Sequence, residues 1–321
     1  MRKLVTVLSV AMLLLLAACT PAANQGSAAP AGKKLTIGMA NLSLCCAYFI
    51  GMSKAVQEEA KAYPNITILE TNADGKVEKL TSDVEDLISK KVDGIILSGA
   101  FIEAAPAALD AIKKAGIPVV MVDRLLKGGE YTSWIGPDNF AIGQQVGGYL
   151  VERLGGKGKL AIIRGGPADN TIGSERTRGV LDKVEASGIE VITYADFAGW
   201  STDGGKKAME DLLAQNPELD AVFCENDSMC LGAQTAIKDA GRTDKVLVAG
   251  VDGQKEALLE ILNKTNYVAT GLNNSDQIGR AGFNRMVAIL AGLTAPKDTV
   301  LPSPLISPDN VVKFYDPDSI F

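Results

Sequence analysis

Short apolar runs alternate with amphipathic helical patterns along most of this chain, and this alternation limits the folds that are possible. The apolar runs span residues 35–40, 66–69, 94–97, 117–122, 132–136, 160–163, 221–224, 246–251 and 267–272. Runs this short and this apolar are typical of strands that are buried on both faces of a parallel sheet. Helical spacing of apolar residues lies between them, as in 76–91 and 202–215. The alternation predicts βαβ units with right-handed crossovers.

The number of predicted strands indicates more than one domain. About ten strands are too many for one comfortable open sheet. The 321 residues of the chain are enough for two domains of about 100–200 residues each. The sequence therefore predicts an α/β fold that is divided into two lobes.

The composition excludes several classes of function. The chain has no histidine, which rules out Ser-His-Asp and Cys-His catalytic sites and any metal site with a histidine ligand. Asp and Glu outnumber Lys and Arg by 38 to 32, a net charge of −6, whereas a general nucleic-acid binder needs a basic surface. The sequence also lacks a Gly-x-Ser-x-Gly nucleophile turn, so an enzyme of α/β fold is the weakest alternative, and we expect no cofactor.

The first 33 residues are not expected to belong to the folded body. Arg2 and Lys3 precede an apolar run that ends at Ala18, which is typical of a secretory signal. The run holds 15 residues, fewer than the roughly 20 that a membrane-spanning anchor helix needs. It ends in Leu16-Ala-Ala-Cys19, which resembles the lipobox of bacterial lipoproteins and implies a signal peptide at 1–18 and lipidation of Cys19. Residues 19–33 are rich in Ala, Gly and Pro, and we expect a flexible tether to an extracytoplasmic body on a bacterial membrane.

Polar and aromatic side chains follow most of the predicted strands. Ligands of parallel sheets bind at the carboxyl ends of the strands, so these positions are the candidate site. They offer two carboxylates, two guanidinium groups, two amides and three aromatic rings: Asp123, Asp252, Arg124, Arg176, Asn226, Asn273, Tyr48, Phe49 and Trp200. Charged and amide groups satisfy hydroxyls that both donate and accept, and flat rings pack on the C–H face of a sugar. The set predicts a monosaccharide site.

Each strand-end Asp or Asn also has a simpler interpretation. Such residues often do no more than cap the helix that follows. For Asp138 and Asn139 we expect a cap or a hinge between lobes, and for Arg178 a structural ion pair with a nearby carboxylate.

Several of these segments, in this order, resemble the periplasmic ribose- and galactose-type sugar-binding proteins, the type I solute-binding components of bacterial ABC transporters. The similar segments are Val119-Val-Met-Val-Asp-Arg124, Glu175-Arg-Thr-Arg-Gly179, Asn226-Asp-Ser-Met229, Val248-Ala-Gly-Val-Asp-Gly253 and Asp276-Gln-Ile-Gly279. The resemblance covers about residues 34–302. It implies two similar lobes, each with a mostly parallel sheet between helices, joined by three crossover strands around a ligand cleft.

The resemblance also implies lobe bounds and further contacts. The N-terminal lobe would comprise 34–137 and 274–303, and the C-terminal lobe 138–273 and 304–321. Beside the strand-end residues, it places Cys46 and Ser98 at ligand contacts where relatives often carry an amide. It implies a monosaccharide or small polyol ligand, and those two departures leave the identity of the sugar open.

The function implied by the resemblance is delivery of this ligand to a membrane-embedded ABC permease by a monomeric protein whose lobes close around it. A receptor-type binder that presents a sugar-like signal to a sensor kinase or chemoreceptor is the alternative, because the same closed lobes serve both roles.

Four cysteines remain after Cys19. Cys45 and Cys46 are adjacent, so a bridge between them would be a strained vicinal disulfide beside the cleft. A bridge between Cys224 and Cys230 would instead connect a strand end to the next helix. Disulfides are permitted outside the cytoplasm, and reduced thiols are the alternative.

Overall fold

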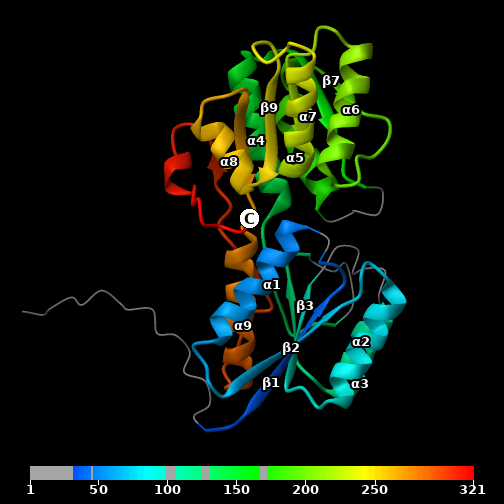
Figure 1. The fold of residues 1–321 in the computed structure, drawn as a ribbon, viewed down its shortest axis with the longest axis vertical. Coiled ribbons are helices and arrows are strands. Elements are labelled where there is room, and N and C mark those ends of the chain that lie inside the picture. The colour runs from blue at the N-terminus through cyan, green and yellow to red at the C-terminus, as the bar shows by residue number, and fades with distance from the viewer. Residues whose placement is uncertain (1–31, 45, 99–105, 125–129, 167–171) are drawn as a thin grey trace, which may run out of the picture.

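Two sheets form the centres of two lobes in the computed structural model, which describes residues 32–44, 46–98, 106–124, 130–166 and 172–321. The predicted signal segment, Cys19 and Cys45 lie outside these ranges. The lobes follow each other along the long axis of the molecule (Figure 1). None of the helices in the described ranges is both long enough and apolar enough to cross a membrane.

The N-terminal lobe contains six strands and four helices among the described residues. They are β1 (Leu35–Asn41), β2 (Ile66–Asn72), β3 (Gly94–Ser98), β4 (Val119–Val122), β5 (Ser133–Gly136), β11 (Asp298–Val300), α1 (Ala47–Ala60), α2 (Val77–Ser89), α3 (Pro106–Ala115) and α9 (Ser275–Leu290). The strand order is β11-β5-β4-β3-β1-β2, and every pair is parallel.

The C-terminal lobe repeats this arrangement. Its elements are β6 (Lys157–Ile163), β7 (Gly188–Thr193), β8 (Ala221–Cys224), β9 (Leu247–Asp252), β10 (Tyr267–Leu272), β12 (Leu305–Ile306), α4 (Asn139–Leu154), α5 (Gly173–Val184), α6 (Thr202–Gln215), α7 (Asp227–Asp239), α8 (Lys255–Leu262) and the short 3₁₀ helix η2 (Val311–Lys313). The strand order is β12-β10-β9-β8-β6-β7, and only the short β12 is antiparallel to its neighbour within the described part of this sheet.

Helices cover both faces of each sheet, which explains why the central strands are mostly apolar. In the N-terminal lobe α1 and α9 pack on one face and α2 and α3 on the other. In the C-terminal lobe α4 and α5 cover one face and α6, α7 and α8 the other. The helical spacing in 76–91 is confirmed, since Leu80, Val84 and Leu87 are fully buried in the core.

Three segments connect the lobes. The chain crosses between β5 and α4, between β10 and α9, and between β11 and β12, and each crossing leads from one sheet to the other. At the first crossing Asp138 caps α4, because its carboxylate accepts a hydrogen bond from the backbone N–H of Ala141 at 2.9 Å. The predicted α/β fold with two lobes and three crossovers is confirmed.

Candidate ligand-binding site

A cavity of about 490 Å³ lies between the lobes, a size within the usual range for small-molecule sites. All the predicted ligand contacts except Ser98 line it: Cys46, Tyr48, Phe49, Asp123, Arg124, Arg176, Trp200, Asn226, Asp252 and Asn273. The carboxyl ends of the strands of both sheets thus contribute to one space, with carboxylates and guanidinium groups on both sides of it.

Ser98 lies apart from this group. It is the last residue of β3 and is buried, and its hydroxyl contacts the sulfur of Met52 at 3.4 Å. Met52 belongs to α1, so the Ser98 hydroxyl contacts this helix, and Ser98 is not among the residues that line the cavity. The structure therefore does not bring Ser98 together with the other predicted contacts.

The first turn of α1 forms the aromatic wall of the cavity. Cys46 has extended backbone and stands at the N-cap, so the helix presents Tyr48 and Phe49 in its first turn. Their rings meet edge to face, with centroids 5.2 Å apart. The Tyr48 hydroxyl donates a hydrogen bond to Oδ1 of Asp123 at 2.7 Å. Burial, followed by the charge of Asp123, raises the pKa of Tyr48 well above its usual value, so this phenol remains a donor.

Asp123 and Arg124 follow β4 directly. Asp123 adopts a φ of 68°, an uncommon value for a residue with a side chain, and its backbone N–H remains bonded to Ile135 of the next strand at 2.9 Å. Both side chains are buried. Burial raises the pKa of the Asp123 carboxyl, although the Tyr48 hydrogen bond and the charge of Arg124 act in the opposite direction.

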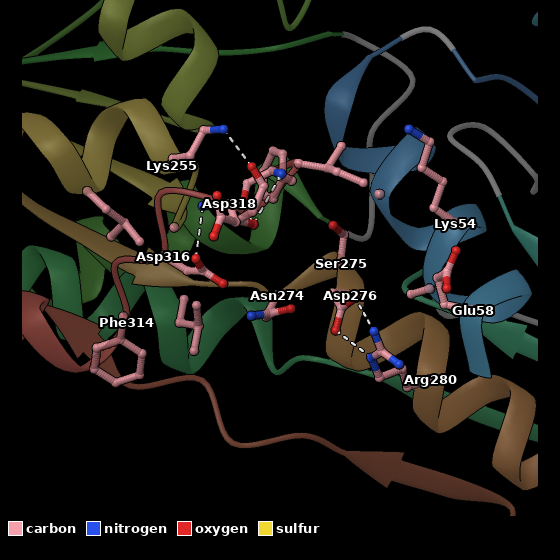
Figure 2. Close-up of a pocket in the computed structure, with 18 residues that line it drawn as sticks. Lys54, Glu58, Lys255, Asn274, Ser275, Asp276, Arg280, Phe314, Asp316 and Asp318 are labelled. Atoms are coloured by element: carbon pink, nitrogen blue, oxygen red, sulfur yellow. Dashed lines mark hydrogen bonds and ion pairs between the residues drawn. The ribbon is translucent and has the colours of Figure 1, made fainter. Parts of the chain in front are cut away.

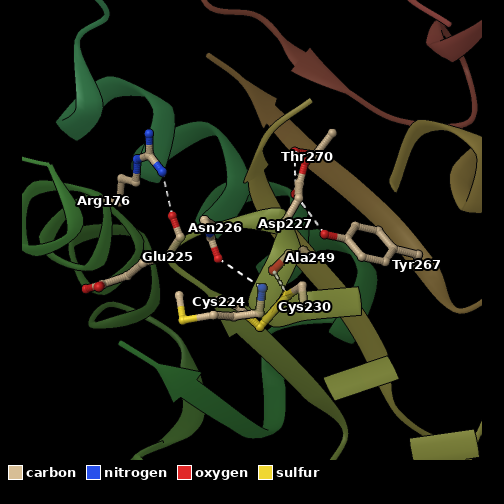
Figure 3. The surroundings of a disulfide bond; sticks show 10 residues. Arg176, Cys224, Glu225, Asn226, Asp227, Cys230, Ala249, Tyr267 and Thr270 are labelled. Carbon is tan, nitrogen blue, oxygen red and sulfur yellow. Dashed lines mark hydrogen bonds between the residues drawn. A yellow bond between two sulfur atoms is a disulfide. The ribbon is translucent and has the colours of Figure 1, made fainter. Parts of the chain in front are cut away.

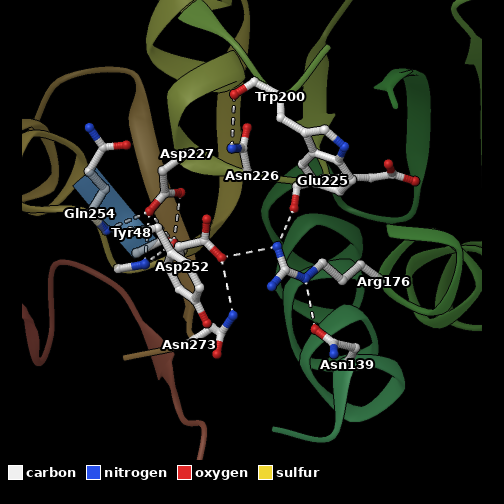
Figure 4. Close-up of polar contacts among 12 residues, drawn as sticks. Tyr48, Asn139, Arg176, Trp200, Glu225, Asn226, Asp227, Asp252, Gln254 and Asn273 are labelled. Atoms are coloured by element: carbon white, nitrogen blue, oxygen red, sulfur yellow. Dashed lines mark hydrogen bonds and ion pairs between the residues drawn. The ribbon is translucent and has the colours of Figure 1, made fainter. Parts of the chain in front are cut away.

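A buried ion pair forms the opposite wall (Figure 4). Arg176 from α5 places Nη1 3.0 Å from Oδ1 of Asp252, at the end of β9, and only 2% of the Arg176 side chain is exposed. The same guanidinium group donates to the backbone oxygen of Glu225 at 2.6 Å and to Oδ1 of Asn139 at 2.8 Å. The arginine is thereby fixed in one orientation by three different elements.

Asn273 connects the carboxylates of the two lobes. Its Nδ2 lies 3.4 Å from Oδ1 of Asp252 and 3.5 Å from Oδ1 of Asp123. Burial raises the pKa of Asp252 to about 7; the carboxylates of Asp227 and Asp123 act in the same direction, and Arg176 opposes them.

Asp227 supports the site without lining it, and the sequence analysis did not identify it. This carboxylate is fully buried and accepts hydrogen bonds from the Tyr267 hydroxyl at 2.7 Å, from Thr270 at 2.8 Å and from the backbone N–H groups of Gly253 and Gln254 at 2.8 and 2.9 Å. These bonds hold the turn after β9, where Asp252 itself has a φ of 130°.

Asn226 and Trp200 lie together on the C-terminal side of the cavity. Asn226 caps α7, since its Oδ1 accepts from the backbone N–H of Met229 at 3.0 Å, and its Nδ2 lies 3.4 Å from the backbone oxygen of Trp200. The capping interpretation and the cavity position therefore both hold for this residue. The indole of Trp200 packs on the backbone of Gly165, where a Cβ atom would collide with the ring.

A disulfide connects Cys224, at the end of β8, to Cys230 in α7 (Figure 3), with Cα atoms 5.4 Å apart. It encloses the turn that carries Glu225, Asn226 and Asp227, so it ties local structure in this lobe, as a bridge between these two cysteines was expected to do. The alternative bridge between Cys45 and Cys46 involves a residue outside the described ranges.

Comparisons with known proteins agree with this architecture. A family model described as a periplasmic binding protein domain matches residues 37–294. The ribose import binding protein of Bacillus subtilis (strain 168) is 30% identical over 305 residues, which cover 94% of this chain and 98% of that protein. A xylitol-binding protein of Mycolicibacterium smegmatis is 31% identical over 249 residues, covering 77% of this chain and 70% of that protein.

A solved structure gives the same result in three dimensions. An ABC transporter solute-binding protein from Bacillus halodurans C-125, crystallised with myo-inositol, superposes with a TM-score of 0.82 at 27% identity and covers 88% of this chain and 97% of its own. The family model covers most of both sheets, with β11 and β12 beyond its end, and most of the residues around the cavity. This chain therefore belongs to the periplasmic binding protein family, in the two-lobe type I form.

Proposed function

We propose that this protein is the substrate-binding component of an ABC importer and that it carries a monosaccharide or small polyol. The observation that supports this most is the cavity between the lobes, where aromatic rings, carboxylates, guanidinium groups and amides converge. The relatives point to the same ligand class, because a ribose import protein, a xylitol-binding protein and a myo-inositol complex are among them.

The charges in the cavity indicate a neutral ligand. Asp252 is paired with Arg176, and Asp123 lies beside Arg124, so neither sign is in excess. A ligand with many hydroxyls can donate to the carboxylates and accept from the guanidinium groups without bringing a charge of its own.

Binding is coupled to lobe closure in this proposal. Residues 34–137 with 274–303 move as one body against 138–273 with 304–321, and the three crossings act as the hinge. A ligand that contacts Asp123 and Arg124 on one side and Arg176 and Asp252 on the other stabilises the closed state, which the permease then recognises.

A thermal-shift screen tests the ligand class. Pentoses, hexoses, inositols and sugar alcohols are each added at high concentration, with amino acids and short peptides as the comparison set. A ligand at a hundredfold excess over Kd adds about 2.7 kcal/mol to the free energy of unfolding, enough for a clear rise in Tm. Stabilisation by the comparison set alone would contradict the proposal.

Affinity should increase as the pH rises through about 7, because ligand hydroxyls donate to the ionised form of Asp252 and burial raises its pKa to that value. At pH 5 most unliganded molecules carry the protonated form of Asp252, so Kd should be more than tenfold weaker than at pH 9. The raised pKa of Asp252 also affects the stability of the unliganded protein. The free energy of unfolding should fall as the pH rises from about 4 to 7, because the folded state keeps a proton that the unfolded state has already released.

Isothermal titration calorimetry between pH 5 and 9 measures this dependence. Asp252→Asn is the matched variant, since it keeps the shape of the side chain and removes the titrating group. We expect a weaker and flatter profile for Asp252→Asn. An affinity that is flat or falls with rising pH in the unmodified protein would be inconsistent with an ionised Asp252 as acceptor.

The lipid anchor is a separate part of the proposal and depends on the Leu16-Ala-Ala-Cys19 segment. Cys19→Ser should abolish incorporation of labelled palmitate and release the protein from the membrane, because the thiol is the attachment point. Ligand affinity should not change, since the described body begins well after the anchor. Labelling of the Cys19→Ser protein would show that a residue other than Cys19 is acylated, and the assignment of the anchor to Cys19 would be wrong.

A further inference from the structure

The last eight residues of the sequence run from the C-terminal lobe into the space between the lobes. Phe314 and Tyr315, which follow η2, pack against the core of the C-terminal lobe. Lys255 of α8 donates a hydrogen bond to the backbone oxygen of Ser319 at 2.5 Å. In Figure 2 Asp318 lies between Lys255 on one side and Ser275, at the start of α9, on the other. The segment is therefore carried by one lobe and directed at the other.

Phe321 makes the contact with the N-terminal lobe. Its ring meets the ring of Tyr48 edge to face, with centroids 5.2 Å apart and an interplanar angle of 84°. It also joins the apolar cluster that α1 and α9 form on their sheet. Gly51 of α1 lies beside this residue, since a Cβ atom at Gly51 would be in ordinary contact with Cβ of Phe321 at 3.4 Å.

Phe321 also stands between two cavities. The ligand cavity has a volume of about 490 Å³. A second cavity of about 460 Å³, shown in Figure 2, is lined by α1, α8, the start of α9 and residues of the final segment. Among the residues that the structure describes, Phe321 is the one that lines both. Phe321 thus borders both the ligand cavity and a second space of similar size.

We infer that Phe321 is a specificity-determining residue of the ligand site. Its ring closes the cavity on the side of α1 and limits the occupant to one compact ring or a short polyol. The Phe321 ring also packs against Tyr48, whose hydroxyl donates to Asp123. This contact keeps Tyr48 and Asp123 in place on the wall of the cavity. Without the ring the two cavities become continuous, and a ligand with a second sugar unit gains room. This inference rests on the proposed function and deepens it.

The test compares Phe321→Ala with Ile320→Ala in the full chain. Ile320 is the neighbouring residue, 49% exposed, and it does not line the ligand cavity. The first probe is the monosaccharide or polyol that binds best in the screen. The second is a larger ligand that contains the first one, namely a disaccharide or, for a monosaccharide, its methyl glycoside. Phe321→Ala should lower the affinity for the smaller ligand at least tenfold. It should also reduce the ratio of the affinity for the smaller ligand to that for the larger one at least tenfold. Ile320→Ala should stay within twofold of the unmodified protein for both.

Two further measurements test the size of the side chain at position 321 and its contact with Tyr48 separately. Phe321→Leu keeps an apolar side chain of intermediate size and should recover part of the preference. Hydrogen exchange in the first turns of α1 should be faster in Phe321→Ala than in Ile320→Ala, because Tyr48 loses its neighbour. Unchanged preference in Phe321→Ala, or equal effects in both variants, overturns the inference while leaving the proposed function intact. If the unmodified protein binds no sugar or polyol, the proposed function fails and this inference fails with it.

Discussion

Arg176→Ala should abolish measurable ligand binding and destabilise the C-terminal lobe. The substitution removes a buried guanidinium group that contacts Asp252, Asn139 and the backbone of Glu225. Breaking a buried ion pair from one side costs about 3–5 kcal/mol, because the remaining group is left poorly hydrated and without its partner. The Asp252 carboxyl would take up a proton at neutral pH, since its pKa loses the one lowering charge of Arg176.

Arg178→Ala is the matched control for this change. Arg178 lies two positions further along the same helix, its side chain is 61% exposed, and it pairs with Glu175, as the sequence analysis expected. Exposed pairs contribute about 0–1 kcal/mol. Urea unfolding and calorimetry on both variants give the comparison. If Arg176→Ala loses no more stability and affinity than Arg178→Ala, the buried network is not what holds this wall.

The central strands were predictable from sequence because burial on both faces leaves few polar side chains in them. β4 and β8 are buried along their full length, and both lie inside their sheets. β7 was missed because it is an edge strand in which exposed and buried residues mix. β11 and β12 hold only three and two residues, so their pairing depends on where the crossings place them rather than on a local pattern.

The site was predictable for a related reason. Parallel strands in one sheet end at the same edge, so polar residues after each strand gather there, as Asn226 after β8 and Asp252 at the end of β9 do. The sequence does not show whether a side chain at a strand end points into the cavity. Ser98 ends its strand in the same way, but Met52 of α1 covers it, and that contact depends on helix packing. Phe321 reaches the cavity only through the tertiary course of the final segment, which no local pattern encodes.

Asp252→Ala and Arg124→Ala should each remove a large part of the binding free energy. Asp252 is 7% exposed and Arg124 is 3% exposed, and they face the cavity from opposite lobes. Loss of one partner of a buried charged hydrogen bond costs about 2–5 kcal/mol, which weakens Kd by roughly 30-fold or more. If the ligand stabilises closure by contacting both lobes, as proposed, a loss on either side should have a similar effect.

Asp252→Ala should have two opposing effects on the stability of the unliganded protein. Ionisation of Asp252 costs free energy in the folded state, as its raised pKa shows, so its removal relieves that cost. The same substitution leaves Arg176 without its carboxylate partner. Asp252→Asn keeps a hydrogen-bond acceptor for Arg176 and should therefore fold as stably as the unmodified protein while still binding the ligand weakly. Asp309→Ala, at an exposed position of the same lobe, serves as the control for a lost charge. Calorimetry with the ligand from the screen decides the matter: less than a tenfold loss for both Asp252→Ala and Arg124→Ala would place the ligand elsewhere in the molecule.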